Sequence, residues 1–171
     1  MCSSDLLLPM TAGVVLAARR RPASAGVAIA VATLCKQTGA VALLPVLYLA
    51  LRGDRLRGLR RVAVGFAVPL IVVALLVGPG DLLFWAVLGN GSYVGFDTAS
   101  LYVVGMFILM TAAFAACQAP MLWWTPSAWR NVERRRSERD LWLWLASSGV
   151  AVAFGFHFFG HYYLQLLPPL A

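Results

Sequence analysis

The sequence predicts an all-α fold, a polytopic transmembrane helical bundle truncated at both ends. Hydrophobic residues make up 61% of the chain and charged residues only 12%, whereas a soluble domain carries about a quarter charged residues. The apolar residues form long uncharged runs such as Val62–Gly78 and Ala99–Ala119, which approach the length that crosses about 30 Å of hydrocarbon. The arginines stand directly beside these runs, as the positive-inside rule describes for membrane proteins.

Both ends of the sequence look cut. Residues 1–6, Met1–Leu6, resemble a translated sequencing adapter with a GTG codon read as the initiating Met, so we expect them to be an artefact. The transmembrane region then occupies residues 7–171, and its first helix lies near residues 7–18. At the other end, residues 162–171 read as the start of another apolar helix, which needs roughly 20 residues to span a membrane. The chain is therefore predicted to be an internal fragment.

Three arginine clusters predict the topology. Arg19–Arg21, Arg52–Arg61 and Arg130–Arg139 should all be cytoplasmic, so residues 24–51 leave and return to the same side. At 1.5 Å per residue this segment is too short for two full crossings. It predicts a hairpin of two short helices with a break near Lys36–Gly39. The alternative is one tilted span with a misplaced basic loop.

The rest of the chain predicts further membrane helices. Apolar runs place them at residues 62–78, 99–119 and 141–159, with a charged cytoplasmic loop or helix at Arg130–Asp140. No internal repeat or soluble domain is evident in the sequence. These features predict a multi-pass protein of the inner (plasma) membrane. They also exclude nucleic acid as a partner, because cytoplasmic flanks explain the net charge of +7 and no nucleic-acid motif accompanies it.

Lys36 is the only lysine and stands inside an apolar segment. A cation at membrane depth is expensive and marks a functional site by default. Backbone that breaks a helix there must be buried in protein or line a cavity. We therefore expect Lys36, with the neighbouring amide of Gln37, to bind a phosphate as a point charge. The alternative is a lysine that reaches the membrane interface and binds no ligand.

Two histidines near the end of the chain suggest polar contacts rather than a metal. His157 and His161 are four residues apart and would share one face of a helix. No carboxylate or cysteine stands nearby to complete a metal site. We therefore assign no metal site, and expect these histidines to be interface anchors or polar ligand contacts.

Two stretches resemble a known enzyme family. LCKQTGAVALLPVLYLALRG (Leu34–Gly53) is similar to the lysine-containing segment of GT-C type glycosyltransferases that use polyprenyl-phosphate sugars. FFGHYYLQLLPPLA (Phe158–Ala171) resembles a helix start common in bacterial members of family 39 and the aminoarabinose transferase-like group. FWAVLGNGSYVG (Phe84–Gly95) also looks similar. The resemblance implies a fragment of an integral membrane glycosyltransferase of the cell envelope.

Such enzymes move a sugar from a lipid-linked phosphate donor to an acceptor at the outer membrane face. The resemblance implies that Lys36, beside Gln37, lies near the donor phosphate, and that His161 and Tyr162 border the cavity of the lipid carrier. The partners would be a polyprenyl-phosphate-linked sugar and the lipid bilayer. The resemblance assigns no cofactor to this chain and leaves a divalent metal open for the full-length parent.

The catalytic carboxylate of this family has no counterpart in the sequence. It lies in the first outer loop, and no Asp or Glu of this chain matches it. No catalytic residue is therefore assigned here. The general base is expected in a missing N-terminal region, so the parent would be an enzyme and the fragment itself inactive.

Two other functions fit the same residues. In a membrane transporter or lipid flippase, Lys36 would contact substrate at the bilayer midplane. Transporters often combine broken helices with internal repeats, and this sequence predicts the break but shows no repeat. In a non-catalytic assembly subunit, Lys36 would instead pair with an acidic helix of a partner.

Overall fold

The computed structural model describes residues 4–84, 100–153 and 160–170, and every regular element in these ranges is helical. The chain divides into two compact units, Met1–Tyr93 and Val94–Ala171. Several sequence predictions lie outside the described residues: part of the adapter segment (1–3), residue 99, residues 154–159 with His157, and most of Phe84–Gly95. The all-α prediction is confirmed for the residues described.

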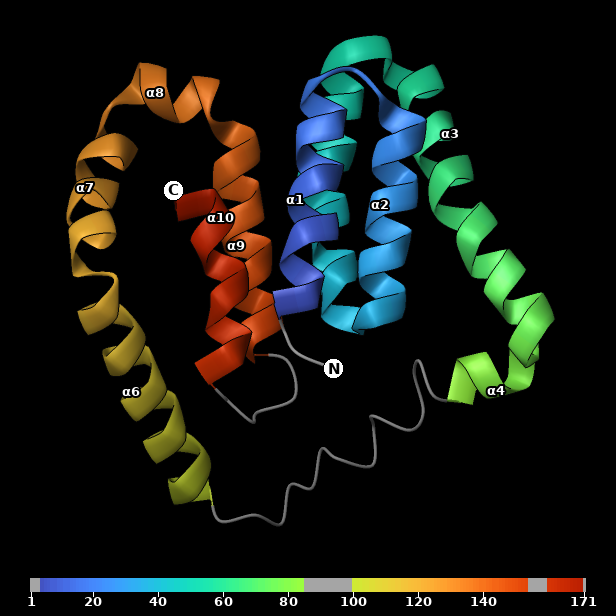
Figure 1. The fold of residues 1–171 in the computed structure, drawn as a ribbon. Coiled ribbons are helices and arrows are strands. Elements are labelled where there is room, and N and C mark those ends of the chain that lie inside the picture. Colours follow the sequence, from blue (N-terminus) through green and yellow to red (C-terminus); the bar gives the residue numbers. More distant parts are fainter. Residues whose placement is uncertain (1–3, 85–99, 154–159, 171) are drawn as a thin grey trace. The chain divides into compact units, whose positions relative to one another are not determined.

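The first unit holds α1 (Ser4–Ala18), α2 (Pro22–Cys35), η1 (Gln37–Ala42), α3 (Leu43–Val77) and α4 (Pro79–Leu83) (Figure 1). Here η denotes a 3₁₀ helix. α2 ends at Cys35, and the next residue, Lys36, has an extended backbone with φ −160° and ψ 134°. The helix break thus falls at the first residue of the range that the sequence predicts for it.

The arginine-rich segment 52–61 is helical, and the chain turns back within it. α3 covers 35 residues, but the apolar helices on the two sides of the turn are Gln37–Gly53 and Arg55–Val77, so the turn lies between the predicted hairpin, which ends at residue 51, and the predicted helix from residue 62. One distance shows how sharp the turn in α3 is. A Cβ built on Gly58 would lie 2.7 Å from the Ala50 carbonyl oxygen, whereas residues eight positions apart lie about 12 Å apart along a straight helix. Arg55 has a positive φ of 34° at the bend. Arginine and leucine favour helix, which explains why helical hydrogen bonding continues on both sides of the turn.

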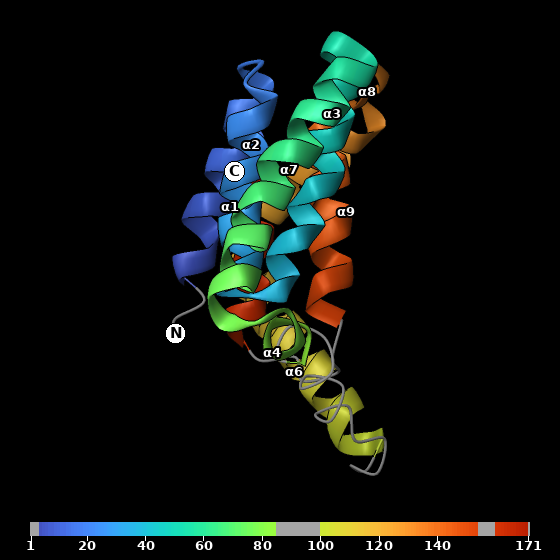
Figure 2. The ribbon, with the colours of Figure 1, turned by 90° about the vertical axis from the view of Figure 1, so that its right-hand side faces the viewer.

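The bend gives α3 two antiparallel legs, coloured teal and green in Figure 1. The connection from α1 to α2 lies at the same end of this unit as the bend in α3. The break between α2 and η1 and the short α4 lie at the opposite end (Figures 1 and 2). Arg19–Arg21 and Arg52–Arg61 therefore share one end of the first unit, and Lys36 lies at the other.

Small residues bring α2 and the second leg of α3 into backbone contact. A Cβ on Gly26 would lie 2.8 Å from the Phe66 nitrogen, and a Cβ on Gly65 would lie 2.9 Å from the Ala23 carbonyl carbon. Packing of this kind is typical of helices in membranes, where small residues permit close approach. The largest side chains at the centre of the unit are fully or almost fully buried: Met10, Ile29, Val46 and Val62.

The second unit holds α6 (Ser100–Cys117), α7 (Ala119–Arg130), α8 (Val132–Ser137), α9 (Arg139–Ala153), η3 (Gly160–Leu166) and α10 (Leu167–Leu170). α6 and α7 meet at an angle of 88°. The bend lies where Pro120 enters the first turn of α7, because proline cannot donate a helical hydrogen bond to the preceding turn. The segment predicted to start a membrane helix at residue 162 is instead a 3₁₀ helix followed by one turn of α-helix.

Few of the described helices reach the length of a membrane span. By length and composition, Arg55–Val77 can cross a membrane, and Leu101–Cys117 with Ala119–Arg130 would be a second span if this bent pair is counted as one. The other apolar helices of the first unit, Leu6–Ala18, Pro22–Cys35 and Gln37–Gly53, are shorter. The structure thus shows an all-helical protein, and a polytopic bundle remains a proposal.

Candidate functional site

Lys36 forms a backbone corner between two helices. Its N–H donates to the carbonyl oxygen of Ala32 at 2.9 Å, and its own carbonyl oxygen accepts from the N–H of Gly39 at 2.8 Å. The first bond completes the last turn of α2 and the second opens η1. One extended residue therefore changes the chain direction while its backbone polar groups stay paired, as buried backbone requires.

Gly39 explains why the corner forms here. A Cβ at this position would lie 2.6 Å from both the carbonyl carbon and the carbonyl oxygen of Ala32, so only glycine lets η1 pack against the end of α2. Gly39, Ala32 and Ala42 are all buried. The packing of Gly39 against Ala32 and the two backbone hydrogen bonds of Lys36 thus hold its backbone in place.

The side chains at this corner suit an anion. Lys36 is partly buried, Gln37 is exposed, and Thr38 Oγ1 is buried without a hydrogen-bond partner among the described residues. An ammonium, an amide and a hydroxyl thus follow one another along three residues, which together supply donors for a phosphate. Lys36 also directly follows the last residue of α2, where the helix dipole favours a positive charge, so the lysine has a structural role even with no ligand.

The other two predicted site residues belong to the second unit. His161 and Tyr162 lie in η3, where Tyr162 packs against the apolar cluster around Val152 and Tyr163. The hydroxyl groups of Tyr163 and Thr111 are hydrogen-bonded at 2.8 Å. The predicted site residues therefore fall in two pairs, Lys36–Gln37 in the first unit and His161–Tyr162 in the second.

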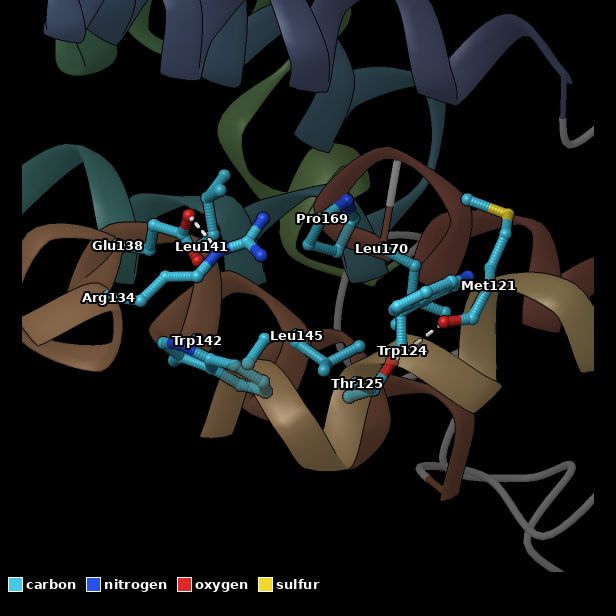
Figure 3. Close-up of a pocket in the computed structure, with 11 residues that line it drawn as sticks. Met121, Trp124, Thr125, Arg134, Glu138, Leu141, Trp142, Leu145, Pro169 and Leu170 are labelled. Atoms are coloured by element: carbon cyan, nitrogen blue, oxygen red, sulfur yellow. Dashed lines mark hydrogen bonds and ion pairs between the residues drawn. The ribbon is translucent and has the colours of Figure 1, made fainter. Parts of the chain in front are cut away.

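The second unit contains a cavity that the sequence interpretation missed. It has a volume of about 220 Å³ and is bounded by α7, α8, α9 and α10 (Figure 3). Its lining is mainly apolar and aromatic, with a charged pair at one end: Met121, Trp124, Thr125, Ala128, Arg134, Glu138, Leu141, Trp142, Leu145, Pro169 and Leu170. The only sequence signal for it is the run of tryptophans that precedes an arginine cluster.

Besides Thr38 and the indole N–H of Trp142, three buried residues of the described chain carry polar side-chain atoms without a partner. Trp144, Ser148 and Gln165 are at most 3% exposed, and their indole, hydroxyl and amide groups make no hydrogen bond within the part of the chain that the structure describes. Each such group costs about 1–3 kcal/mol when it stays unpaired. Trp144 and Ser148 are four residues apart on α9, and α9 packs against η3, which carries Gln165.

The described residues include no group of three or more histidine, cysteine, aspartate or glutamate side chains that could hold a metal ion. Comparisons with family models, with curated proteins and with solved structures find no match to this chain. The structure alone therefore describes this chain as an all-helical protein in which a lysine, Lys36, interrupts two successive helices.

Proposed function

We propose that this chain is part of an integral membrane glycosyltransferase that moves a sugar from a polyprenyl-phosphate donor to an acceptor at the outer membrane face. The observation that carries the proposal is the helix break at Lys36. It lies at the end of the first unit opposite to the arginine segments, as a donor site across the bilayer from cytoplasmic arginines requires. The resemblance of Leu34–Gly53 to GT-C type enzymes supports the same assignment.

Exposed apolar surface supports a multi-pass placement in the inner (plasma) membrane. Only 11% of the most apolar stretch of Arg55–Val77 is buried, and Leu75 and Leu76 are 79% and 80% exposed. Monomeric soluble proteins rarely expose contiguous apolar surface on this scale. The shorter helices then lie within the bundle as broken or re-entrant segments, which are tolerated where protein or a cavity surrounds them.

In this proposal Lys36 and Gln37 hold the donor phosphate, and His161 and Tyr162 border the polyprenyl chain. A general base supplied by the parent protein removes the proton from the acceptor hydroxyl, whose oxygen then attacks the anomeric carbon. The bond between that carbon and the phosphate oxygen breaks, and the electron pair stays on the phosphate. The ammonium of Lys36 stabilises this negative charge. The chain alone thus binds the donor without turning it over.

Donor binding by the full chain tests the proposal. The chain is placed in lipid nanodiscs, and its affinity for a fluorescent polyprenyl phosphate is measured. Lys36→Met keeps the apolar stem of the side chain and removes its charge, which should weaken binding by about 10- to 100-fold, since hydrogen bonds to charged groups contribute about 1.5–3 kcal/mol. Lys36→Arg should retain most of the affinity. Arg60→Met, at an exposed arginine of α3, is the matched control. Equal affinities for Lys36→Met and Arg60→Met would refute the proposal.

A transporter or lipid flippase is the second candidate, and the same helix break favours it, because transporters bind substrates where helices are interrupted. Proteoliposomes separate the two functions. Movement of a labelled polyprenyl phosphate between leaflets, lost in Lys36→Met, would favour translocation. Binding without movement favours the transferase.

A further inference from the structure

The cavity of the second unit lies beside a helix suited to a membrane surface. α7 leaves α6 at 88°, so if α6 follows the membrane normal, α7 runs in the plane of the interface. Trp123 and Trp124 on α7 are 80% and 71% exposed, and tryptophan is the residue most typical of the membrane–water interface. Arg130 ends α7 and Arg134–Arg136 follow in α8. An amphipathic helix with tryptophans and flanking arginines is typical of interfacial segments.

Local contacts place one arginine at the cavity and direct another elsewhere. Asn131 caps α8, because its side-chain oxygen accepts a hydrogen bond from the Arg134 N–H at 3.1 Å. This bond holds the backbone of Arg134 in position. The Arg134 Nε donates to Glu138 Oε1 at 2.9 Å. Arg135 instead lies over the Trp129 ring, 5.2 Å from its centroid. Trp129 in turn meets the ring of Trp142 edge-on at 4.8 Å.

The cavity combines an apolar interior with a cationic end. Figure 3 shows Arg134 and Glu138 at one end, and Met121, Trp124 and Thr125 at the other. Glu138 engages only Nε of the guanidinium in the described part of the chain, which leaves the planar Nη edge for a second anion. The volume of about 220 Å³ is below the 300–1,000 Å³ of sites that enclose a whole small molecule. It suits one part of a larger amphiphile.

We propose that the cavity between α7, α8 and α9 binds an anionic phospholipid, with its phosphate on Arg134 and an acyl chain against Trp124, Trp142 and Leu145. The charge of the segment agrees with this ligand, since residues 130–140 contain five arginines against Glu133, Glu138 and Asp140. Arginine binds phosphate through two parallel hydrogen bonds. The inference uses the membrane placement of the proposed function but not its sugar transfer, so loss of donor binding in Lys36→Met would leave it intact.

Native mass spectrometry of the full chain, released from nanodiscs of phosphatidylcholine and phosphatidylglycerol, tests the proposal. We expect phosphatidylglycerol to be retained in preference to phosphatidylcholine. Arg134→Gln should reduce this retention about tenfold. The Arg134 side chain is 60% exposed, so this change should not disturb folding. Arg60→Gln in the first unit is the matched control and should retain the lipid.

Two more variants separate the headgroup from the acyl chain. Glu138→Gln removes the competing carboxylate and should increase retention, a gain that misfolding cannot imitate. Leu145→Trp fills the apolar part and should release the lipid while Arg134 is intact. Equal retention by Arg134→Gln and Arg60→Gln would overturn the proposal. So would displacement of phosphatidylglycerol by inorganic phosphate alone, since that would identify a small-anion site in place of a lipid site.

Discussion

Replacing Gly65 by alanine should loosen the packing of α2 against the second leg of α3. The added Cβ would lie 2.9 Å from the carbonyl carbon of Ala23, about half an ångström inside the 3.4 Å at which ordinary contacts begin, and closer still to the carbonyl oxygen of that residue. Both neighbours are backbone atoms, so no change of rotamer relieves the overlap. The two helices must move apart.

The magnitude is the difference between two opposing effects. Alanine in a helix is about 0.5–1 kcal/mol more favourable than glycine. Overpacking of a well-packed contact costs about 1–3 kcal/mol, and here it falls on a buried glycine. We expect Gly65→Ala to lower the free energy of unfolding by about 1–2 kcal/mol.

Gly53→Ala is the matched control in the same helix. A Cβ at Gly53 meets nothing within 4 Å, so this change should raise the free energy of unfolding by up to about 1 kcal/mol. The assay is loss of helicity by circular dichroism as SDS is titrated into protein in a mild detergent. If Gly65→Ala proves as stable as Gly53→Ala, the close approach of α2 and α3 is not what holds the first unit together.

A double variant sharpens the test. Gly26 faces the same crossing, where its Cβ would lie 2.8 Å from the Phe66 nitrogen. Once Gly65→Ala has separated the helices, Gly26→Ala should cost less than it does alone, because residues in one contact are not additive. Strictly additive losses would place the two glycines in independent contacts.

The remaining predictions concern the second unit. Tyr163→Phe removes the hydrogen bond to Thr111 and should lower the free energy of unfolding by about 1 kcal/mol. No change in the SDS titration would mean that water replaces this bond. Asn131→Ala removes the side-chain cap of α8 and should cost about 1 kcal/mol, seen as faster hydrogen exchange of the Arg134 amide. Asn131→Ser retains a capping oxygen and should exchange slowly; equally fast exchange in both variants would contradict the capping role.

Local sequence signals located much of the helical framework. The first helix was located by the apolar run after Leu6 and by the arginines at 19–21. The predicted helix and α1 both end at Ala18. The residues from Lys36 to Gly39 indicate a break, because a charge, an amide and a glycine interrupt an otherwise apolar helix. The arginines of 52–61 indicated a boundary between two helices, and the chain turns back there at Arg55, although α3 stays helical on both sides of the turn.

The cavity and the unpaired polar groups were beyond sequence reasoning. Trp129 lies in α7 and Trp142 in α9, and only the turn of the chain through α8 brings their rings to 4.8 Å. Ser148 and Gln165 look like ordinary polar residues until folding buries them to 0% and 2% exposure. Such contacts depend on directions that the chain takes at bends, which residue types along a run do not encode.

The sequence by itself determined the all-helical class, the break at Lys36 and the separation of that lysine from the arginines. These follow from local chemistry, because long apolar runs form helices and charges collect at their ends. Only the tertiary structure decided that the turn in α3 lies at Arg55, that Gly26 and Gly65 bring α2 against the second leg of α3, and that Arg134 lies beside an apolar cavity. Those features arise from contacts between residues distant in the chain, where a glycine without a Cβ or a proline without an N–H sets the angle at which helices meet.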